Sequence, residues 1–131
     1  MLMKKFLTLD VALLLLRVAL GAVFVAHGWQ KLTHMEGTVM FFGSLGFPAV
    51  LAYLVALVEF LGGIAMLLGI FLPYAGTLIA IVMLVAAFYV KAGKSFIGGW
   101  EFDFVLLLLA VALAIAGPGR YGIKIGKELK S

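Results

Sequence analysis

Four long hydrophobic stretches constrain this 131-residue chain more than any other feature. A bilayer hydrocarbon core of about 30 Å is crossed by about 20 residues of α-helix. In this chain 66% of the residues are hydrophobic and 12% are charged, whereas about a quarter of the residues of ordinary globular domains are charged. The surplus apolar surface has to face lipid. We therefore predict an all-α integral membrane four-helix bundle that forms one membrane domain over residues 1–131.

The hydrophobic stretches place the four spans at about residues 10–31, 49–72, 73–91 and 100–116. Pro73 suits the first turn of the third span, where its missing N–H does no harm. The segment between the first two spans is too short and too polar to cross, and we expect a short interfacial helix within it. Structural roles in helix packing and in ending the last span are expected for four residues: Gly28, Gly62, Gly63 and Pro118.

Lysine and arginine residues near the span ends predict the orientation of the chain. Six lie on the side that holds both termini, and three lie on the other side. This asymmetry predicts that the N- and C-termini are cytoplasmic. Because no basic stripe lies on a soluble face, we expect no nucleic-acid partner. The two groups are Lys4, Lys5, Arg120, Lys124, Lys127 and Lys130 on the first side, and Lys31, Lys91 and Lys94 on the second.

Glu59 lies near the middle of the second hydrophobic stretch. A carboxylate at that depth is tolerated only with a partner or in a wet cavity, so it marks a candidate functional site. Arg17, in the first span, lies at a similar estimated depth, and we predict a buried Arg17–Glu59 pair. Two interpretations stay open: the pair is a structural link between two helices, or it forms part of an intramembrane binding site.

A second polar group is expected near the outer face. His27 and Lys31 are one helical turn apart, and Asp103 lies at the start of the fourth span beside Glu101. The functional interpretation is a polar vestibule, in which His27 and Lys31 face Asp103. The simpler alternative is that these side chains are solvated helix ends. The predicted ligand-binding residues are therefore Arg17, His27, Lys31, Glu59 and Asp103, while catalytic residues stay unknown.

Several kinds of redox chemistry have no support in the sequence. With no cysteine, the chain cannot run thiol–disulfide exchange or hold an iron–sulfur cluster on thiolates. Its two histidines, His27 and His34, lie on one short stretch and cannot ligate a haem from opposite faces. No metal site and no covalently bound cofactor are predicted.

Several short motifs, in their order along the chain, resemble the DoxX family (DoxX/DoxD-like) of small bacterial and archaeal four-helix membrane proteins. The resemblance covers nearly the whole chain. It implies a multi-pass protein of the prokaryotic cytoplasmic, or inner, membrane, associated with respiratory or sulfur redox systems. One departure is Pro73-Tyr74, where many members carry a Thr-Arg pair. The motifs are Arg17-Val-Ala-Leu-Gly21, His27-Gly28 with Lys31, Gly46-Phe-Pro48, Glu59-Phe-Leu-Gly62-Gly63, Glu101-Phe-Asp103-Phe and Gly117-Pro-Gly-Arg-Tyr121.

Three functions remain open from the sequence. The first is a quinone-linked membrane subunit of an oxidoreductase system, which receives electrons from a soluble oxidoreductase partner and is not an enzyme alone. The second is a structural or assembly subunit without a ligand of its own. The third is a small proton-coupled transporter, which a close cation at Glu59 disfavours because it would hold the carboxylate ionised. The lipid bilayer is the expected surrounding, and a homo-oligomer is compatible with the short spans.

Overall fold

The computed structural model describes residues 2–124, so Lys127 and Lys130 lie outside the described residues. Over this range it confirms the all-α membrane fold, with four helices long and apolar enough to span a membrane. A short helix, α2, connects the first two spans, as predicted. The helices are α1 (Leu2–Thr33), α2 (Met35–Ser44), α3 (Ala49–Leu68), α4 (Leu72–Val85) and α5 (Glu101–Ala116).

Two segments of π-helix lie at the turn between α4 and α5. They are η1 (Ala86–Val90), which extends α4, and η2 (Phe96–Trp100), which precedes α5. Counted with these extensions, the third and fourth spans cover Leu72–Val90 and Phe96–Ala116. Both therefore approach the length that a bilayer requires.

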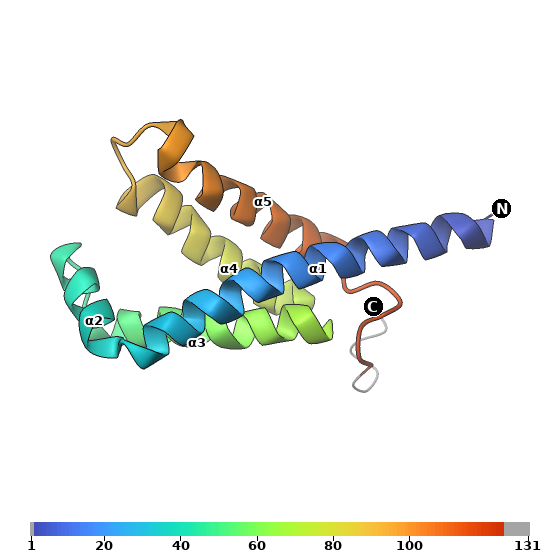
Figure 1. Ribbon diagram of the computed structural model, residues 1–131, viewed down its shortest axis with the longest axis horizontal. Helices are drawn as coiled ribbons and strands as arrows, with labels where there is room; N and C mark the ends of the chain where they lie inside the picture. The colour runs from blue at the N-terminus through green and yellow to red at the C-terminus, as the bar shows by residue number, and fades with distance from the viewer. Residues whose placement is uncertain (1, 125–131) are drawn as a thin grey trace.

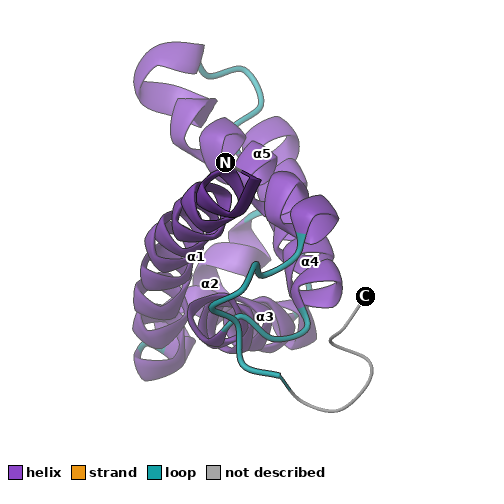
Figure 2. Ribbon diagram, turned by 90° about the vertical axis from the view of Figure 1, so that its right-hand side faces the viewer, coloured by secondary structure: helices purple, strands orange, loops and turns teal. Residues whose placement is uncertain are grey.

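The helices form two antiparallel pairs, α1 with α3 and α4 with α5. Figure 1 shows the start of α1 and the segment after α5 at one end of the molecule, and α2, η1 and η2 at the other end. Figure 2, a view along the bundle, shows the four long helices around a common interior. The two pairs lie close where α3 turns into α4, and they diverge towards the end that holds α2 (Figure 1).

The predicted second span is wrong at its C-terminal boundary. The hydrophobic stretch continues to Leu72, but α3 ends at Leu68 because Gly69 adopts a left-handed conformation with φ of 73°. Glycine reaches this region without a steric penalty and commonly ends helices. Phe71, with φ of 52°, is the one non-glycine residue between 2 and 124 with positive φ, and α4 begins immediately after it. Residues 69–71 therefore form a tight hairpin connection.

Glycines hold α1 and α3 unusually close together. A Cβ atom on Gly28 would lie 2.6 Å from the Cα atom of Phe60, and one on Gly63 would lie 2.6 Å from the backbone nitrogen of Val25. Both distances are far shorter than a normal carbon contact of about 3.5–4.0 Å. The predicted structural roles of Gly28 and Gly63 are thus explained by backbone contact. Gly62 faces α4 instead, because a Cβ atom on Gly62 would lie 3.0 Å from Cδ1 of Ile79.

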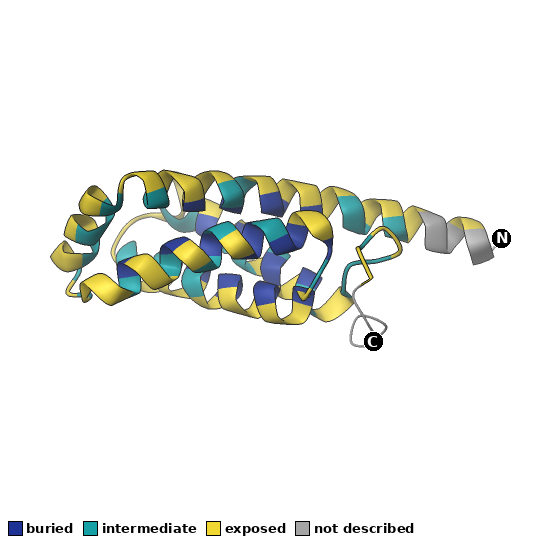
Figure 3. Ribbon diagram, turned by 90° about the horizontal axis from the view of Figure 1, so that it is seen from below, coloured by how far each residue is buried: buried dark blue, intermediate teal, exposed yellow. Residues whose placement is uncertain are grey.

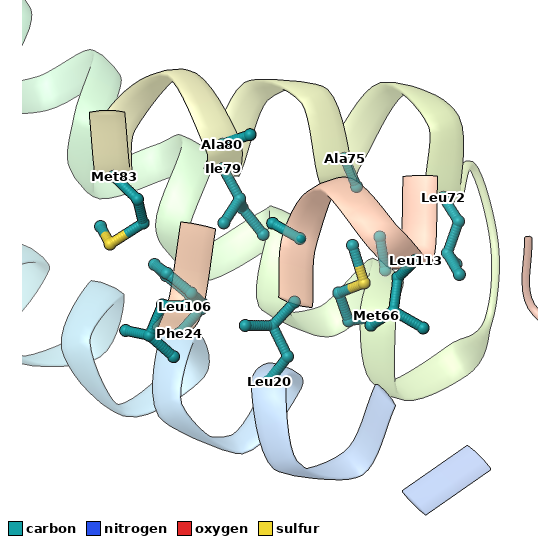
Figure 4. Close-up of a cluster of buried hydrophobic side chains, with 12 residues drawn as sticks. Leu20, Phe24, Met66, Leu72, Ala75, Ile79, Ala80, Met83, Leu106 and Leu113 are labelled. Carbon is teal, nitrogen blue, oxygen red and sulfur yellow. The ribbon is translucent and has the colours of Figure 1, made fainter. Parts of the chain in front are cut away.

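The apolar core lies at the centre of the bundle (Figure 4). Buried residues face inward on every long helix (Figure 3). Many large hydrophobic side chains are exposed on the outside. This inside-out pattern suits a bundle whose outer surface faces lipid tails. The largest fully buried apolar side chains are Phe24, Leu20, Met66, Leu72, Ile79 and Leu113.

Candidate functional site: a charged cavity between two helix pairs

Arg17 is buried, with 1% of its surface exposed, at the end of the bundle that holds the termini. Its guanidinium group donates three hydrogen bonds to backbone carbonyl oxygens. Nε donates to Met66 at 3.0 Å and Nη2 to Leu67 at 3.1 Å, both in the last turn of α3. Nη1 donates to Pro118, just beyond α5, at 3.0 Å. Arg17 therefore joins three segments of the chain. Pro118, which is predicted to end the last span, also accepts one of these bonds.

The predicted Arg17–Glu59 pair is wrong. Met66 and Leu67 follow Glu59 by seven and eight residues, about 10–12 Å along the helix. The prediction treated residues 49–72 as one continuous span, whereas α3 ends four residues earlier. The last four carbonyls of a helix have no partner within it, and a buried guanidinium supplies several donors in a fixed geometry. Arg17 is thus bound to a helix end, and Glu59 has a different partner.

Glu59 forms an ion pair with Lys31 of α1. The Nζ atom of Lys31 lies 2.8 Å from Oε2 of Glu59. Glu59 points into the bundle, and its side chain is 4% exposed, whereas that of Lys31 is 24% exposed. Ala52, Ala56 and Gly63 share this face of α3 at helical spacing and are also buried.

A second ion pair joins Lys91, immediately after η1, to Asp103 in the first turn of α5. The Nζ atom of Lys91 lies 2.5 Å from Oδ2 of Asp103. Again the carboxylate is the more buried partner, because the side chain of Asp103 is 10% exposed and that of Lys91 is 33% exposed. These are the two salt bridges found among residues 2–124. Each lies within one helix pair.

Both ion pairs line the same cavity of about 520 Å³. Residues of both helix pairs, α1–α3 and α4–α5, line this cavity. Of its 24 lining residues, 19 are hydrophobic, and α3 and α4 contribute the most of these. The other five are His27, Lys31, Glu59, Lys91 and Asp103. A cavity of this size, with apolar walls and a few convergent polar groups, is typical of a site for a small amphipathic molecule.

The predicted vestibule is partly reproduced. His27, Lys31 and Asp103 line one cavity together with Glu59, but Lys31 pairs with Glu59, and Asp103 pairs with Lys91. Arg17 does not line this cavity. Glu101 does not line it either. Its Oε1 instead accepts a hydrogen bond from the backbone N–H of Gly98 at 3.0 Å. Lys91 is a site residue that the sequence analysis did not predict. There it contributes only to the count of basic residues that predicts the orientation of the chain.

His27 has one ring nitrogen committed to its own helix. Nδ1 lies 2.8 Å from the carbonyl oxygen of Val23, one turn earlier. Because a carbonyl can only accept, Nδ1 carries the proton in this bond, and in the neutral ring Nε2 is left as an acceptor. The cavity thus combines two ammonium donors with one imidazole acceptor.

Helix α2 and the start of α3 cover the wide end of the cavity. Phe41, Phe42 and Phe47 line it from this side, and the ring of Phe47 lies 5.1 Å from that of Tyr89. The hydroxyl of Tyr89 donates a hydrogen bond to the carbonyl oxygen of Leu45 at 3.0 Å. These contacts connect α2 to η1 across the space between the helix pairs.

The hydrophobic side of the cavity reaches the lipid-facing surface. Leu54 of α3 and Leu78 and Ile81 of α4 line it, and their exposed fractions are 55%, 49% and 54%. A lipid-soluble molecule could therefore reach the charged groups from the membrane. Among the described residues, no group of three His, Asp or Glu side chains is arranged to hold a metal ion.

Comparisons with known proteins agree with the resemblance seen in the sequence. The family model described as DoxX matches residues 12–92, a region that contains Arg17, His27, Lys31, Glu59 and Lys91. Asp103 lies beyond it. No solved structure matches the chain.

Two curated proteins are similar over most of their length. The "Putative oxidoreductase CatD" of Bacillus subtilis (strain 168) is 41% identical over 108 residues, which cover 82% of this chain and 81% of that protein. The "Inner membrane protein YqjF" of Escherichia coli (strain K12) is 32% identical over 119 residues, which cover 87% of this chain and 90% of that protein.

Proposed function

This chain belongs to the DoxX family of membrane proteins, and we propose that it is the quinone-binding membrane subunit of an oxidoreductase system. In this proposal the cavity between the two helix pairs holds the quinone ring. The name of the Bacillus subtilis relative supports the oxidoreductase context, and that of the Escherichia coli relative supports an inner-membrane location. The proposed orientation places both termini in the cytoplasm.

The observation that carries the proposal is the arrangement of charge around the cavity. The side chains of Glu59 and Asp103 are nearly buried, while those of Lys31 and Lys91 are more exposed. The two pairs have no net charge, so a neutral ligand matches them better than an anion. Each ammonium group has three N–H donors and uses one for its carboxylate. Two donors on each lysine therefore remain for the carbonyl oxygens of a ligand.

A quinone has the properties that this cavity selects. Its ring is uncharged and carries carbonyl acceptors, and its isoprenoid tail is soluble in lipid. The tail would leave through the hydrophobic side, past Leu54, Leu78 and Ile81. Reduction of a quinone to a hydroquinone takes two electrons and two protons. We propose that a soluble oxidoreductase partner supplies the two electrons and that water supplies the two protons. Nε2 of His27 would then accept a hydrogen bond from a hydroquinone hydroxyl.

The transporter alternative is less well supported. A proton-coupled transporter needs a carboxylate that takes up and releases a proton during each cycle. Glu59 and Asp103 each accept a hydrogen bond from a lysine within 2.8 Å, so both carboxylates are held by partners within the protein. The assembly-subunit alternative predicts that the purified protein binds no quinone, and the following experiment tests it.

The test is a direct measurement of quinone binding. The full chain is purified, reconstituted into nanodiscs free of quinone, and titrated with a decyl-substituted ubiquinone by equilibrium dialysis. We expect saturable binding, and at least about tenfold weaker binding after Glu59→Gln, because Lys31 loses a charged partner that positions it. Glu36→Gln is the matched control, since Glu36 is exposed on α2 and does not line the cavity.

Two results would contradict the proposal. One is the absence of saturable binding to the wild-type protein. The other is equal binding by Glu59→Gln and Glu36→Gln, which would place any quinone site outside this cavity.

A further inference from the structure

The cavity contains two lysine–carboxylate pairs that belong to different halves of the bundle. Lys31 and Glu59 join α1 to α3, and Lys91 and Asp103 join the end of η1 to α5. Neither ion pair crosses from one helix pair to the other. The two half-buried lysines are thus held by separate halves of the protein, and both line the same cavity.

We infer that Lys31 and Lys91 are two separate anchors for the two opposite carbonyl oxygens of one ring. The ligand class is therefore a 1,4-dicarbonyl ring compound, as distinct from a lipid with a single polar head. This inference rests on the proposed quinone function and specifies how the cavity recognises its ligand. A bound ring would bridge the α1–α3 pair and the α4–α5 pair.

The burial of the four charged side chains supports two anchors. In each pair the carboxylate side chain is 4% or 10% exposed, and the exposed fraction of its lysine side chain is more than three times larger. Each carboxylate fixes the position of its lysine and compensates its charge. Each lysine therefore presents donors to the cavity without adding net charge, and a bidentate neutral acceptor would use both.

The hydrophobic part of the cavity suits the same ligand. Phe24, Val82 and Met83 line it in the interior of the bundle, and Phe102 lines it beside Asp103. Apolar and aromatic side chains of this kind pack against the faces of a flat ring and exclude water. A ligand with a single carbonyl would bind one lysine. The N–H donors of the other lysine would then have no ligand acceptor in this apolar cavity.

The experiment compares two probes in the reconstituted full chain. One is a decyl-substituted 1,4-naphthoquinone, and the other is the decyl-substituted 1-tetralone, which has a similar bicyclic ring and one carbonyl. Wild-type protein should bind the naphthoquinone at least about tenfold more tightly, since it makes one more charge-assisted hydrogen bond. Lys31→Met and Lys91→Met should each abolish this preference and leave the tetralone affinity within about threefold.

Lys94→Met is the control, because Lys94 lies in the same loop as Lys91, is exposed, and does not line the cavity. It should keep the wild-type preference. If Lys91→Met does not fold because Asp103 is left unpaired, the double variant Lys91→Met/Asp103→Leu removes both charges and gives the same prediction.

The outcomes separate this inference from the proposed function. If the wild-type protein binds the naphthoquinone but one lysine variant keeps the preference, the two-anchor inference fails and the quinone function stands. Equal affinity of the wild-type protein for both probes also overturns two-anchor recognition. If neither probe binds, both the inference and the proposed function fail.

Discussion

Replacement of Arg17 by lysine tests how the ends of α3 and α5 are held together. Arg17 donates from three different nitrogen atoms to the carbonyls of Met66, Leu67 and Pro118. Lysine has one nitrogen on a less extended side chain, so it cannot reach all three acceptors. The positive charge stays buried, and its desolvation penalty is therefore not relieved.

The magnitude follows from the number of bonds lost. A hydrogen bond to a charged group contributes about 1.5–3 kcal/mol, and we expect Arg17→Lys to lose one or two of the three. The free energy of unfolding should fall by about 2–5 kcal/mol. At about 4 °C per kcal/mol for a chain of this size, the Tm should fall by about 10 °C or more.

The measurement is thermal unfolding in detergent, followed by the fluorescence of Trp29 and Trp100. Arg120→Lys is the control for the same chemical change. Arg120 is exposed, and among residues 2–124 its bond is made by the backbone N–H, which donates to Oδ1 of Asp10 at 3.0 Å. The control should unfold within about 2 °C of the wild-type protein. If both variants unfold at the same temperature, the guanidinium does not hold these segments together.

Three further predictions address packing, charge and orientation. Gly28→Ala places a Cβ 2.6 Å from Cα of Phe60 and should lower the free energy of unfolding by about 1–3 kcal/mol in the same unfolding assay. Gly37→Ala is the control, because a Cβ on Gly37 has no atom within 4 Å, and it should change the free energy of unfolding by less than about 0.5 kcal/mol. Lys31→Met leaves Glu59 buried and unpaired and should lower the free energy of unfolding by about 3–5 kcal/mol. The double variant Lys31→Met/Glu59→Leu should regain most of that stability. An equal loss of stability in both variants would argue against the ion pair. Reporter domains that are active only in the cytoplasm should be active when fused to either terminus, and activity at one terminus alone would contradict the four-span topology.

The sequence predicted the fold well because the membrane imposes simple length and composition rules. The helical spacing of Ala52, Ala56 and Gly63 with Glu59 predicts one inward face of α3, and all four residues are buried. His27, Lys31 and Asp103 were grouped because α1 ends and α5 begins at the same side of the bundle, and they line one cavity with Glu59.

The partners of the charged residues were harder to predict. Arg17 binds backbone carbonyls, which every residue type carries, so no sequence pattern identifies Met66 or Leu67 as acceptors. The position of those carbonyls depends on where α3 ends, and Gly69 was the signal for that boundary within a continuing hydrophobic stretch. Lys91 looked like an ordinary helix-end lysine, although Asp103, twelve residues later across the hairpin, indicated a partner.

Photolabelling of the reconstituted protein with a photoreactive quinone tests the central claim most directly. Covalent adducts would be mapped by peptide mass spectrometry, with and without an excess of unmodified quinone. We predict that competed adducts fall on residues that line the cavity, such as Phe42, Val82 and Phe102. Adducts confined to outward-facing residues away from the cavity, such as Leu61 and Ile115, or adducts that unmodified quinone does not displace, would contradict it.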